Sequence, residues 1–279
     1  MVLKSHAKIN LTLSVNKKLL SGLHDIQSMF CLINLFDSIT IKRNNNSKFD
    51  KISFKGPHSK FVKKSNNSIK KILNLLRKNN LVSGYYSVKV FKRIPVFAGF
   101  GGGTSNAMTV LKFILGKKLK KELIENVSSK IGSDFKLFLY NHGFLKNLET
   151  VIKINKTFSL NFLIIYPKIK NSTKKVYSKV KNFSKKKSFS FKQIDEKKKL
   201  INYLANSSND LQSIVVKKNP IIQKLLIDVK NQKGCHLSRL TGSGSGCYGL
   251  FKDINCSKAA LKILRKKYPK FWFSIAKTI

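Results

Sequence analysis

Apolar and polar residues alternate along residues 6–15 near the start of the chain, and the same two-residue period returns along residues 38–42. Successive side chains of a β-strand point to opposite faces, so this period predicts two strands that each have one buried face. A turn signal, Ser21-Gly22, lies between them. A further alternating stretch, residues 86–90, predicts a third strand that runs into Arg93-Ile94-Pro95.

A second pattern, with apolar residues every three or four positions, predicts amphipathic helices in the same half of the chain. It covers residues 68–78, with Ser68 as the predicted N-cap, and residues 107–115. Another helix is predicted over residues 122–131, which end at Gly132-Ser133-Asp134. The first half of the chain therefore mixes strands with helices.

The second half begins with an apolar strand predicted at residues 162–166. Residues 181–199 are rich in Lys, Ser and Phe, and we expect a solvated insertion or a mobile loop there. The remaining elements are predicted in the order helix, strand, strand, helix, strand, at residues 221–229, 236–240, 248–251, 257–267 and 271–275. This order is typical of a compact α+β layer. We therefore expect two domains, residues 1–152 and residues 153–279.

Composition limits the classes of protein that fit this pattern. The chain has 279 residues, of which 42% are hydrophobic, enough for a folded core and too many for a disordered basic tail. No apolar run approaches the ~18 residues of a membrane span, and the first residues lack the apolar stretch of an export signal. The four cysteines form no CxxC pair, which favours reduced thiols over a zinc site. We expect a cytoplasmic protein with no membrane partner.

The charge balance is strongly basic, with 56 Lys and Arg residues against 12 Asp and Glu residues and a formal net charge of +44. Such a charge allows binding to the phosphates of a nucleic acid without specificity. Only five of the cations are Arg, the residue that reads base edges best. We therefore expect no specific nucleic-acid partner, although a basic nucleic-acid-binding protein stays open as an alternative.

A run of glycines joins the strand predicted at residues 86–90 to the helix predicted at residues 107–115. Gly99 and residues 101–103 are separated only by Phe100, and the hydroxyl residues Thr104 and Ser105 stand where the helix is expected to begin. Glycines let the backbone approach phosphate oxygens closely, and a helix N-terminus adds unpaired N–H groups. The segment predicts a phosphate-binding loop, with a simple tight turn as the alternative.

Two common phosphate-binding motifs do not fit this loop. A Walker A loop has Lys followed by Ser or Thr directly after its last glycine, whereas Gly103 is followed by Thr104-Ser105. A dinucleotide-binding fingerprint needs an acidic residue ~20 positions further on, at the end of a second strand. The nearest candidates, Glu122 and Glu125, lie inside a predicted helix. The loop therefore belongs to another class.

The chain resembles the GHMP kinases in three separated blocks. Residues 95–107, P-V-F-A-G-F-G-G-G-T-S-N-A, resemble the ATP-binding motif P-x-x-x-G-L-G-G-G-S-S-N-A of that superfamily. Residues 7–11, A-K-I-N-L, resemble its opening motif, and residues 241–246, T-G-S-G-S-G, its C-terminal glycine motif. Four shorter details resemble the members that act on 4-diphosphocytidyl-2-C-methyl-D-erythritol in isoprenoid synthesis, at residues 22–28, 105–106, 132–134 and 208–211.

The resemblance implies a fold, an activity and cofactors. The implied fold is α+β, with a ribosomal protein S5 domain 2-like N-terminal domain that binds ATP and a ferredoxin-like C-terminal domain. The implied activity is transfer of a phosphoryl group from ATP, with Mg²⁺, to the 2-hydroxyl of the small-molecule substrate named above, by a monomer or a homodimer. A superfamily kinase that acts on homoserine or mevalonate stays an alternative, as does an inactive pseudokinase.

The same blocks imply roles for individual residues. Asp134 is the implied acceptor of the hydroxyl proton and Lys8 the cation beside it; without the resemblance they are a turn residue and a surface lysine. The cytosine ring is implied to stack on Tyr177 and to bond with His24, and Asn10 is a further substrate contact. No residue is assigned as a metal ligand. The implied nucleotide-binding residues are Asn67, Pro95, Val96, Phe97, Ala98, Gly99, Phe100, Gly101, Gly102, Gly103, Thr104 and Ser105.

Two positions depart from the pattern of the resembled family. Leu23 stands where Tyr is usual, which removes one aromatic face beside the cytosine ring. Phe97 stands in the glycine loop where a small residue is usual, so its ring either points toward the nucleotide or packs outward. Two assigned residues also have an ordinary structural explanation, Asn67 as a helix cap and Tyr177 as a half-buried tyrosine.

Overall fold

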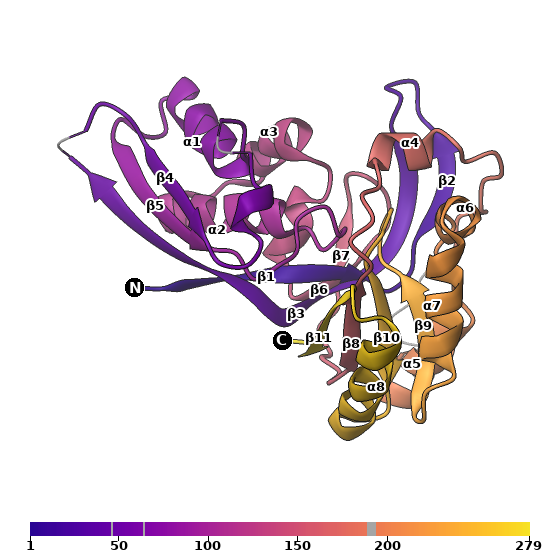
Figure 1. Cartoon of the computed structure of the whole chain (residues 1–279). Helices are drawn as coiled ribbons and strands as arrows, with labels where there is room; N and C mark the ends of the chain where they lie inside the picture. The colour runs from indigo at the N-terminus through magenta and orange to yellow at the C-terminus, as the bar shows by residue number, and fades with distance from the viewer. Residues whose placement is uncertain (46, 64, 189–193) are drawn as a thin grey trace. The chain divides into compact units, whose positions relative to one another are not determined.

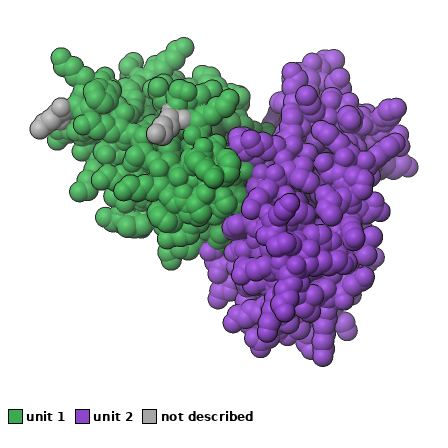
Figure 2. Space-filling model, viewed as in Figure 1, with its two compact units in different colours: residues 1–8, 35–96, 101–140 green, residues 9–34, 97–100, 141–279 purple. Residues whose placement is uncertain are grey.

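The computed structural model describes residues 1–45, 47–63, 65–188 and 194–279. The chain divides into two compact units, each built from separate stretches of sequence (Figure 2). Unit 1 comprises residues 1–8, 35–96 and 101–140, and unit 2 comprises residues 9–34, 97–100 and 141–279. The predicted boundary at residue 152 falls inside unit 2, so the compact units differ from a single cut there. The division into family domains at that residue stays a prediction.

Both units include part of one long strand, β3 (His24–Asn44), whose first half belongs to unit 2 and whose second half belongs to unit 1. The alternation along residues 38–42 predicted only the last part of this 21-residue strand. Residues 25–33 of β3 are all buried, so no alternation marks them as a strand. A continuous buried strand thus connects stretches of sequence that pattern analysis treats separately.

Unit 1 combines strands with three longer helices (Figure 1). The second half of β3 pairs antiparallel with β5 (Tyr85–Phe91), which pairs parallel with β4 (Lys51–Lys55). Helix α1 (Ser68–Lys78) packs against α2 (Gly102–Leu115) and α3 (Lys121–Ile131). The other elements are β1 (Leu3–Asn10), whose last two residues belong to unit 2, η1 (Ser59–Phe61), η2 (Gly116–Lys118) and η3 (Phe135–Leu139).

Helix α1 shows how the apolar pattern of unit 1 becomes structure. Its buried positions are the ones that the helical period selects, with Ile69, Ile72, Leu73 and Leu76 each at most 1% exposed. Burial of such a side chain contributes ~1.5–3 kcal/mol to folding. The helix has the predicted bounds, but its N-cap is Asn67 rather than Ser68, because the Asn67 side chain accepts from the backbone N–H of Lys70.

Unit 2 contains a four-stranded antiparallel sheet with the strand order β11-β8-β10-β9. Helices α7 (Pro220–Lys230) and α8 (Ile254–Lys267) pack against this sheet and against each other. The chain order β8, α7, β9, β10, α8, β11 is that of a ferredoxin-like layer, as predicted. The strands are β8 (Asn161–Tyr166), β9 (Cys235–Leu240), β10 (Cys247–Phe251) and β11 (Trp272–Lys277).

The rest of unit 2 is built on the first half of β3. This half pairs antiparallel with β2 (Ser14–Lys18) and with β6 (His142–Leu145), and β6 pairs with β7 (Val151–Lys153). In the described part of the unit, three shorter helices follow: α4 (Thr173–Tyr177), α5 (Lys197–Ala205) and α6 (Gln212–Lys218). Among the described residues, no helix has both the length and the apolarity needed to span a membrane.

The single strand predicted over residues 6–15 is wrong in one respect. The structure divides it into β1 and β2, and residues 11–13 lie between them. There the backbone turns to other partners: the N–H of Leu11 donates to Met29 at 2.7 Å, and the N–H of Leu13 donates to Ser208 at 3.0 Å. Leu11 and Leu13 remain buried, so the apolar alternation continues although the ladder is interrupted.

Residues 181–188, the first part of the segment predicted as a solvated insertion or mobile loop, are exposed except for half-buried Ser184, as a solvated insertion would be, yet several of them make specific contacts. The side chain of Gln27 both donates to and accepts from the backbone of Lys187, at 3.0 and 2.9 Å. The Lys186 ammonium pairs with Asp25 at 2.7 Å, and the Ser184 hydroxyl donates to Asp210 at 2.7 Å. Ser184 is therefore held by Asp210, and Lys186 and Lys187 are held by β3. Residues 189–193 lie outside the described part of the chain.

Candidate active site

A lysine and a carboxylate that are far apart in the sequence meet in unit 1. The Nζ of Lys8, on β1, donates to Oδ2 of Asp134 at 2.7 Å. The lysine side chain is 1% exposed and that of the aspartate 39% exposed. A buried ammonium requires a counter-charge, and Asp134 supplies it while its carboxylate stays accessible. Asp134 directly precedes η3, yet its side chain does not cap that helix.

Gly101 lies beside this pair. Its φ angle is +68°, in the left-handed region that favours glycine. A Cβ added there would lie 2.6 Å from the Cζ of Phe138 and 3.8 Å from the Cε of Lys8. Only glycine fits this position, and its place brings the glycine loop next to the stem of Lys8.

The backbone after Gly101 forms the start of α2, which begins at Gly102 instead of near Thr104 as predicted. The amide of Ser105 bonds to the carbonyl of Gly101 at 2.8 Å, whereas the first turn of a helix leaves its leading N–H groups without such partners. Gly103, in that first turn, is exposed. The N-terminus of this 14-residue helix is thus suited to an anion such as phosphate.

Buried Asp37 forms hydrogen bonds with the residues before and after the glycine loop in unit 1. Its carboxylate accepts from the backbone N–H groups of Arg93 and Ile94 at 2.8 and 2.9 Å, before the loop. It also accepts from the side-chain amide of Asn106 at 2.9 Å, after the loop, and pairs with the buried ammonium of Lys92. Sequence analysis missed Asp37, because an acidic residue beside an alternating strand carries no signal of its own.

The hydroxyl residues of the loop and of α1 are engaged with neighbours. The Ser5 hydroxyl donates to Ser105 Oγ at 2.8 Å, and the Ser68 hydroxyl donates to the carbonyl of Gly103 at 2.7 Å. Asn67 is buried and caps α1, which is the structural role considered for it from the sequence. A nucleotide contact for Asn67 stays a prediction.

The middle of the predicted loop, residues 97–100, belongs to unit 2, where it packs on the second glycine turn. The carbonyl of Ala98 accepts from the N–H of Gly246 at 2.9 Å. A Cβ on Gly99 would lie 3.1 Å from the carbonyl oxygen of Thr241, which explains a glycine there. Asn10 is fixed near this turn, since its backbone N–H donates to Thr241 Oγ1 at 2.9 Å and its side chain donates to Ser28 at 2.8 Å.

Two aromatic rings lie beside the His24 ring in unit 2. The His24 ring lies 5.1 Å from the ring of Tyr177 and 6.3 Å from that of Phe183, measured between centroids. Phe183 is 44% exposed, and Leu23 next to the cluster in sequence is 54% exposed. Burial, and then the nearby charge of Lys18, lower the pKa of His24, so its imidazole is neutral at neutral pH. A neutral imidazole offers one donor and one acceptor.

Phe183 is a residue that sequence analysis did not single out. It lies in the segment that composition marked as solvated, and nothing local distinguishes it from the other phenylalanines there. Its place beside His24 follows from the anchoring of Ser184 by Asp210 and of Lys186 and Lys187 by β3. Phe183 therefore adds an aromatic ring beside His24, the residue that follows Leu23 in the sequence.

Known proteins resemble this chain over its length. The family of the GHMP kinases N terminal domain matches residues 67–142, and the family of the GHMP kinases C terminal domain matches residues 184–270. The 4-diphosphocytidyl-2-C-methyl-D-erythritol kinase of Pelagibacter ubique is 35% identical over 99% of this chain and 98% of its own length. The kinase of the same name from Wolbachia pipientis is 33% identical over 96% and 95%.

The chain belongs to the 4-diphosphocytidyl-2-C-methyl-D-erythritol kinase family of GHMP kinases. Its fold agrees, since a crystal structure of 4-(cytidine 5'-diphospho)-2C-methyl-D-erythritol kinase superposes with a TM-score of 0.77 at 21% identity, over 99% of both chains. The protein is thus a small-molecule kinase with a GHMP kinase fold. The prediction of the family from separated sequence blocks is confirmed.

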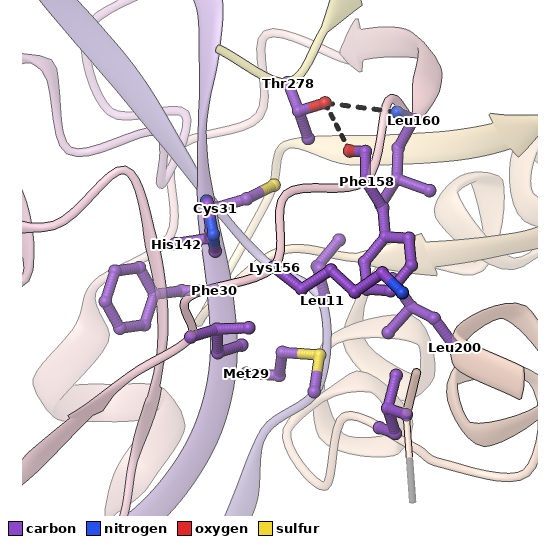
Figure 3. Close-up of a pocket in the computed structure, with 12 residues that line it drawn as sticks. Leu11, Met29, Phe30, Cys31, His142, Lys156, Phe158, Leu160, Leu200 and Thr278 are labelled. Atoms are coloured by element: carbon purple, nitrogen blue, oxygen red, sulfur yellow. Dashed lines mark hydrogen bonds between the residues drawn. The ribbon is translucent and has the colours of Figure 1, made fainter. Parts of the chain in front are cut away.

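A cavity of about 30 Å³ in unit 2 of this GHMP kinase is lined by none of the residues assigned to the site; Figure 3 shows its lining. Its lining is mainly apolar and includes Leu11, Met29, Phe158 and Leu200. The volume suits a few water molecules, whereas small-molecule pockets usually hold ~300–1,000 Å³. The Nε2 of His142, which also lines it, is buried and has no partner among the described residues. The cavity is too small to serve as the nucleotide site.

Proposed function

We propose that this protein transfers the γ-phosphoryl group of ATP to the 2-hydroxyl of 4-diphosphocytidyl-2-C-methyl-D-erythritol, in the cytoplasm. The observation that carries the proposal is the pairing of Lys8 with Asp134 at 2.7 Å beside Gly101 of the glycine loop. The relatives that cover nearly the whole chain have kinase names that specify this substrate. A site with these parts suits phosphoryl transfer to an alcohol.

The glycine loop has the features that a site for the phosphates of ATP requires. Added Cβ atoms would clash at Gly101 and at Gly102, where the nearest atom is Ile94 Cγ2 at 2.9 Å, so both positions of the loop require glycine. The leading N–H groups of α2 and the positive end of its dipole would hold phosphate oxygens. Thr104 adds a half-buried hydroxyl to the same turn.

ATP supplies the phosphoryl group and Mg²⁺ neutralises the charge of its phosphates. Within the described ranges, no three His, Cys, Asp or Glu residues gather in a way that could hold a metal ion. Mg²⁺ commonly keeps several waters and binds through substrate phosphates with one or two carboxylates, a mode that needs no such cluster. Asp134, whose side chain is 39% exposed and pairs with Lys8 next to Gly101, would be one such carboxylate.

The chemical role proposed for Asp134 is to accept the proton of the attacking hydroxyl. Lys8 holds Oδ2 of this carboxylate at 2.7 Å, which fixes its orientation. The hydroxyl O–H bond breaks toward Asp134, the new O–P bond forms, and the bond to the leaving ADP breaks. Phosphoryl transfer has a loose transition state in which the proton leaves late, so position matters more than basicity.

We assign recognition of the cytosine ring to the aromatic cluster around His24. Tyr177 and Phe183 offer faces for stacking, which gives affinity, and neutral His24 offers a donor and an acceptor for the polar edge of the base, which gives identity. Phe183 takes the part of the aromatic residue that Leu23 replaces. Asn10 stays a proposed substrate contact.

A coupled assay of ADP release tests the proposed function, with 4-diphosphocytidyl-2-C-methyl-D-erythritol, homoserine and mevalonate as parallel substrates. The expected result is turnover that depends on the first substrate and on Mg-ATP, with at most trace activity on the other two. Phosphate transfer to the 2-hydroxyl is then located by ³¹P NMR of the product. Faster turnover of homoserine or mevalonate would assign the chain to another branch of the superfamily.

A further inference from the structure

Phe97 has a backbone conformation that aromatic residues rarely adopt. Its φ angle is +66°, in the left-handed region where a Cβ is crowded. The two residues that follow, Ala98 and Gly99, are fixed in turn, because they pack against Gly246 and Thr241 of the second glycine turn. Glycine would relieve the strain, yet this chain has Phe.

Burial of the ring does not explain this choice. The side chain of Phe97 is 46% exposed, so it recovers only part of the free energy that a core phenylalanine gains. Backbone strain that is not offset by burial of the side chain is typical of functional positions. The contacts of the ring therefore indicate its role.

The ring of Phe97 carries a cation. The ammonium of Lys170 lies 5.1 Å from the ring centroid, within the range of a cation–π interaction. Lys170 is exposed, and in the described part of the chain no carboxylate pairs with it. By contrast, Lys186 and Lys267 are neutralised by Asp25 and Asp228. The ring thus fixes the place of the Lys170 charge without cancelling it.

The backbone on either side of Lys170 is tied to the second glycine turn. The Ser245 hydroxyl donates to the carbonyl of Ile169, and the hydroxyls of Thr173 and Ser243 lie 2.9 Å apart. Lys170 is therefore held at both ends of its segment, within the unit that also contains Phe97 and residues 242–246. An uncompensated ammonium held in this way beside two glycine segments is suited to a phosphate group.

We propose that Phe97 and Lys170 form an anion-positioning pair, in which the ring holds the ammonium for contact with a phosphate oxygen of a diphosphate-bearing ligand. This inference rests on the proposed function for the identity of the ligands, which are ATP and the cytidine diphosphate substrate. Both ligands carry a diphosphate group. Separate measurement of the KM for ATP and the KM for the cytidine substrate shows which of the two Lys170 contacts. Phe97 is a positioning residue, because it acts through Lys170.

The test compares Phe97→Gly and Lys170→Met with Lys60→Met in the full-length protein. Lys60 is a matched control, since its ammonium lies 5.3 Å from the ring of Phe61, which is 41% exposed. Lys170→Met is expected to raise one KM about tenfold, the size of one charge-assisted contact, with kcat within about twofold. The ligand whose KM rises is the one that Lys170 contacts. Both KM values of Lys60→Met should equal those of the wild type.

Phe97→Gly separates positioning from packing. It is expected to raise the same KM while the melting temperature stays equal or increases, because glycine removes the strain at φ +66°. The double variant should be no worse than Lys170→Met alone, since both changes remove the same contact. A lower melting temperature with unchanged KM values would overturn the proposal and leave Phe97 as a packing residue, as would wild-type KM values in both single variants.

A titration with inorganic pyrophosphate tests the anion-positioning pair without the proposed substrate. Calorimetry is expected to show binding to the wild type that weakens about tenfold in Lys170→Met and not in Lys60→Met. If the wild type fails to phosphorylate the proposed substrate but keeps this difference, the proposed function fails and the anion-positioning pair stands. Equal pyrophosphate affinity in all three proteins would overturn the pair.

Discussion

The ammonium of Lys8 and the carboxylate of Asp134 are 2.7 Å apart, although 126 positions separate them in the sequence. The lysine comes from β1, and the aspartate from the turn between α3 and η3. Burial of Lys8 makes the pairing necessary, and the exposure of Asp134 leaves its carboxylate open to a ligand. Together with Gly101, the pair forms the part of the proposed machinery that unit 1 contains.

Replacement of Lys8 tests whether orientation of Asp134 matters. We expect Lys8→Met to lower kcat about 100-fold, because the aspartate loses its fixed position while the apolar chain of methionine still fills the space. The melting temperature should change little, since Asp134 stays hydrated. Lys112→Met is the control, as Lys112 donates to the carbonyl of Phe138 and does not contact Asp134. Equal kcat values for the two variants would refute an orienting role.

Gly101 tests the shape of the phosphate loop. Gly101→Ala should destabilise the protein by about 1–3 kcal/mol and abolish measurable ATP binding, because the new Cβ meets Phe138 and the φ angle is +68°. Gly116→Ala is the control, since Gly116 has φ +48° and nothing within 4 Å of an added Cβ. Urea unfolding and nucleotide titration measure both effects. ATP affinity that falls equally in the two variants would point to general strain instead of the loop.

The pH dependence of substrate affinity tests His24. The pKa of His24 is lowered from its ordinary value of about 6.5, so the imidazole is neutral at pH 7 and above. The KM for the cytidine substrate should therefore be constant from pH 7 to 8. As the pH falls through the lowered pKa, protonation removes the acceptor and KM should rise. His24→Gln should remove this rise, whereas His236→Gln, at a site outside the aromatic cluster, should keep it. A rise that persists in His24→Gln would exclude His24 as its source.

Phe183 tests the assignment of the stacking face. Phe183→Ala should raise the KM for the cytidine substrate about two- to tenfold, the range of a single aromatic contact, and leave the KM for ATP unchanged. Phe183→Tyr should restore the wild-type value. Phe113→Ala removes an equally exposed ring, 43% against 44%, from α2 and serves as the control. An unchanged KM in Phe183→Ala would remove Phe183 from the substrate site.

Local pattern predicted the elements whose partners are near in sequence. The helical period located α1 at its observed bounds, and turn and strand signals located the ferredoxin-like layer of unit 2. The family could also be predicted from the sequence, because each of its motifs, around Lys8, in the glycine loop and around Asp134, is a short continuous segment. These features depend on short-range geometry, which residue identity largely determines.

The features that sequence missed depend on long-range partners. Asp37 gains its role from Arg93, Ile94 and Asn106, and Phe183 gains its place from the anchoring of Lys187 by Gln27, contacts that no local period encodes. The N-cap of α1 was misassigned because Asn67 and Ser68 are both good caps. The absence of a specific nucleic-acid partner stays a prediction.

The most direct test of the catalytic assignment is the turnover of Asp134→Asn with Mg-ATP and 4-diphosphocytidyl-2-C-methyl-D-erythritol. The change is isosteric and removes only the ability to accept a proton and the negative charge that faces Lys8. Asp195→Asn, at an exposed aspartate paired with Lys199, is the control. The account predicts a kcat about 100- to 10,000-fold lower in Asp134→Asn, with ATP affinity within about twofold of the wild type. A kcat near that of the wild type and of Asp195→Asn would contradict it.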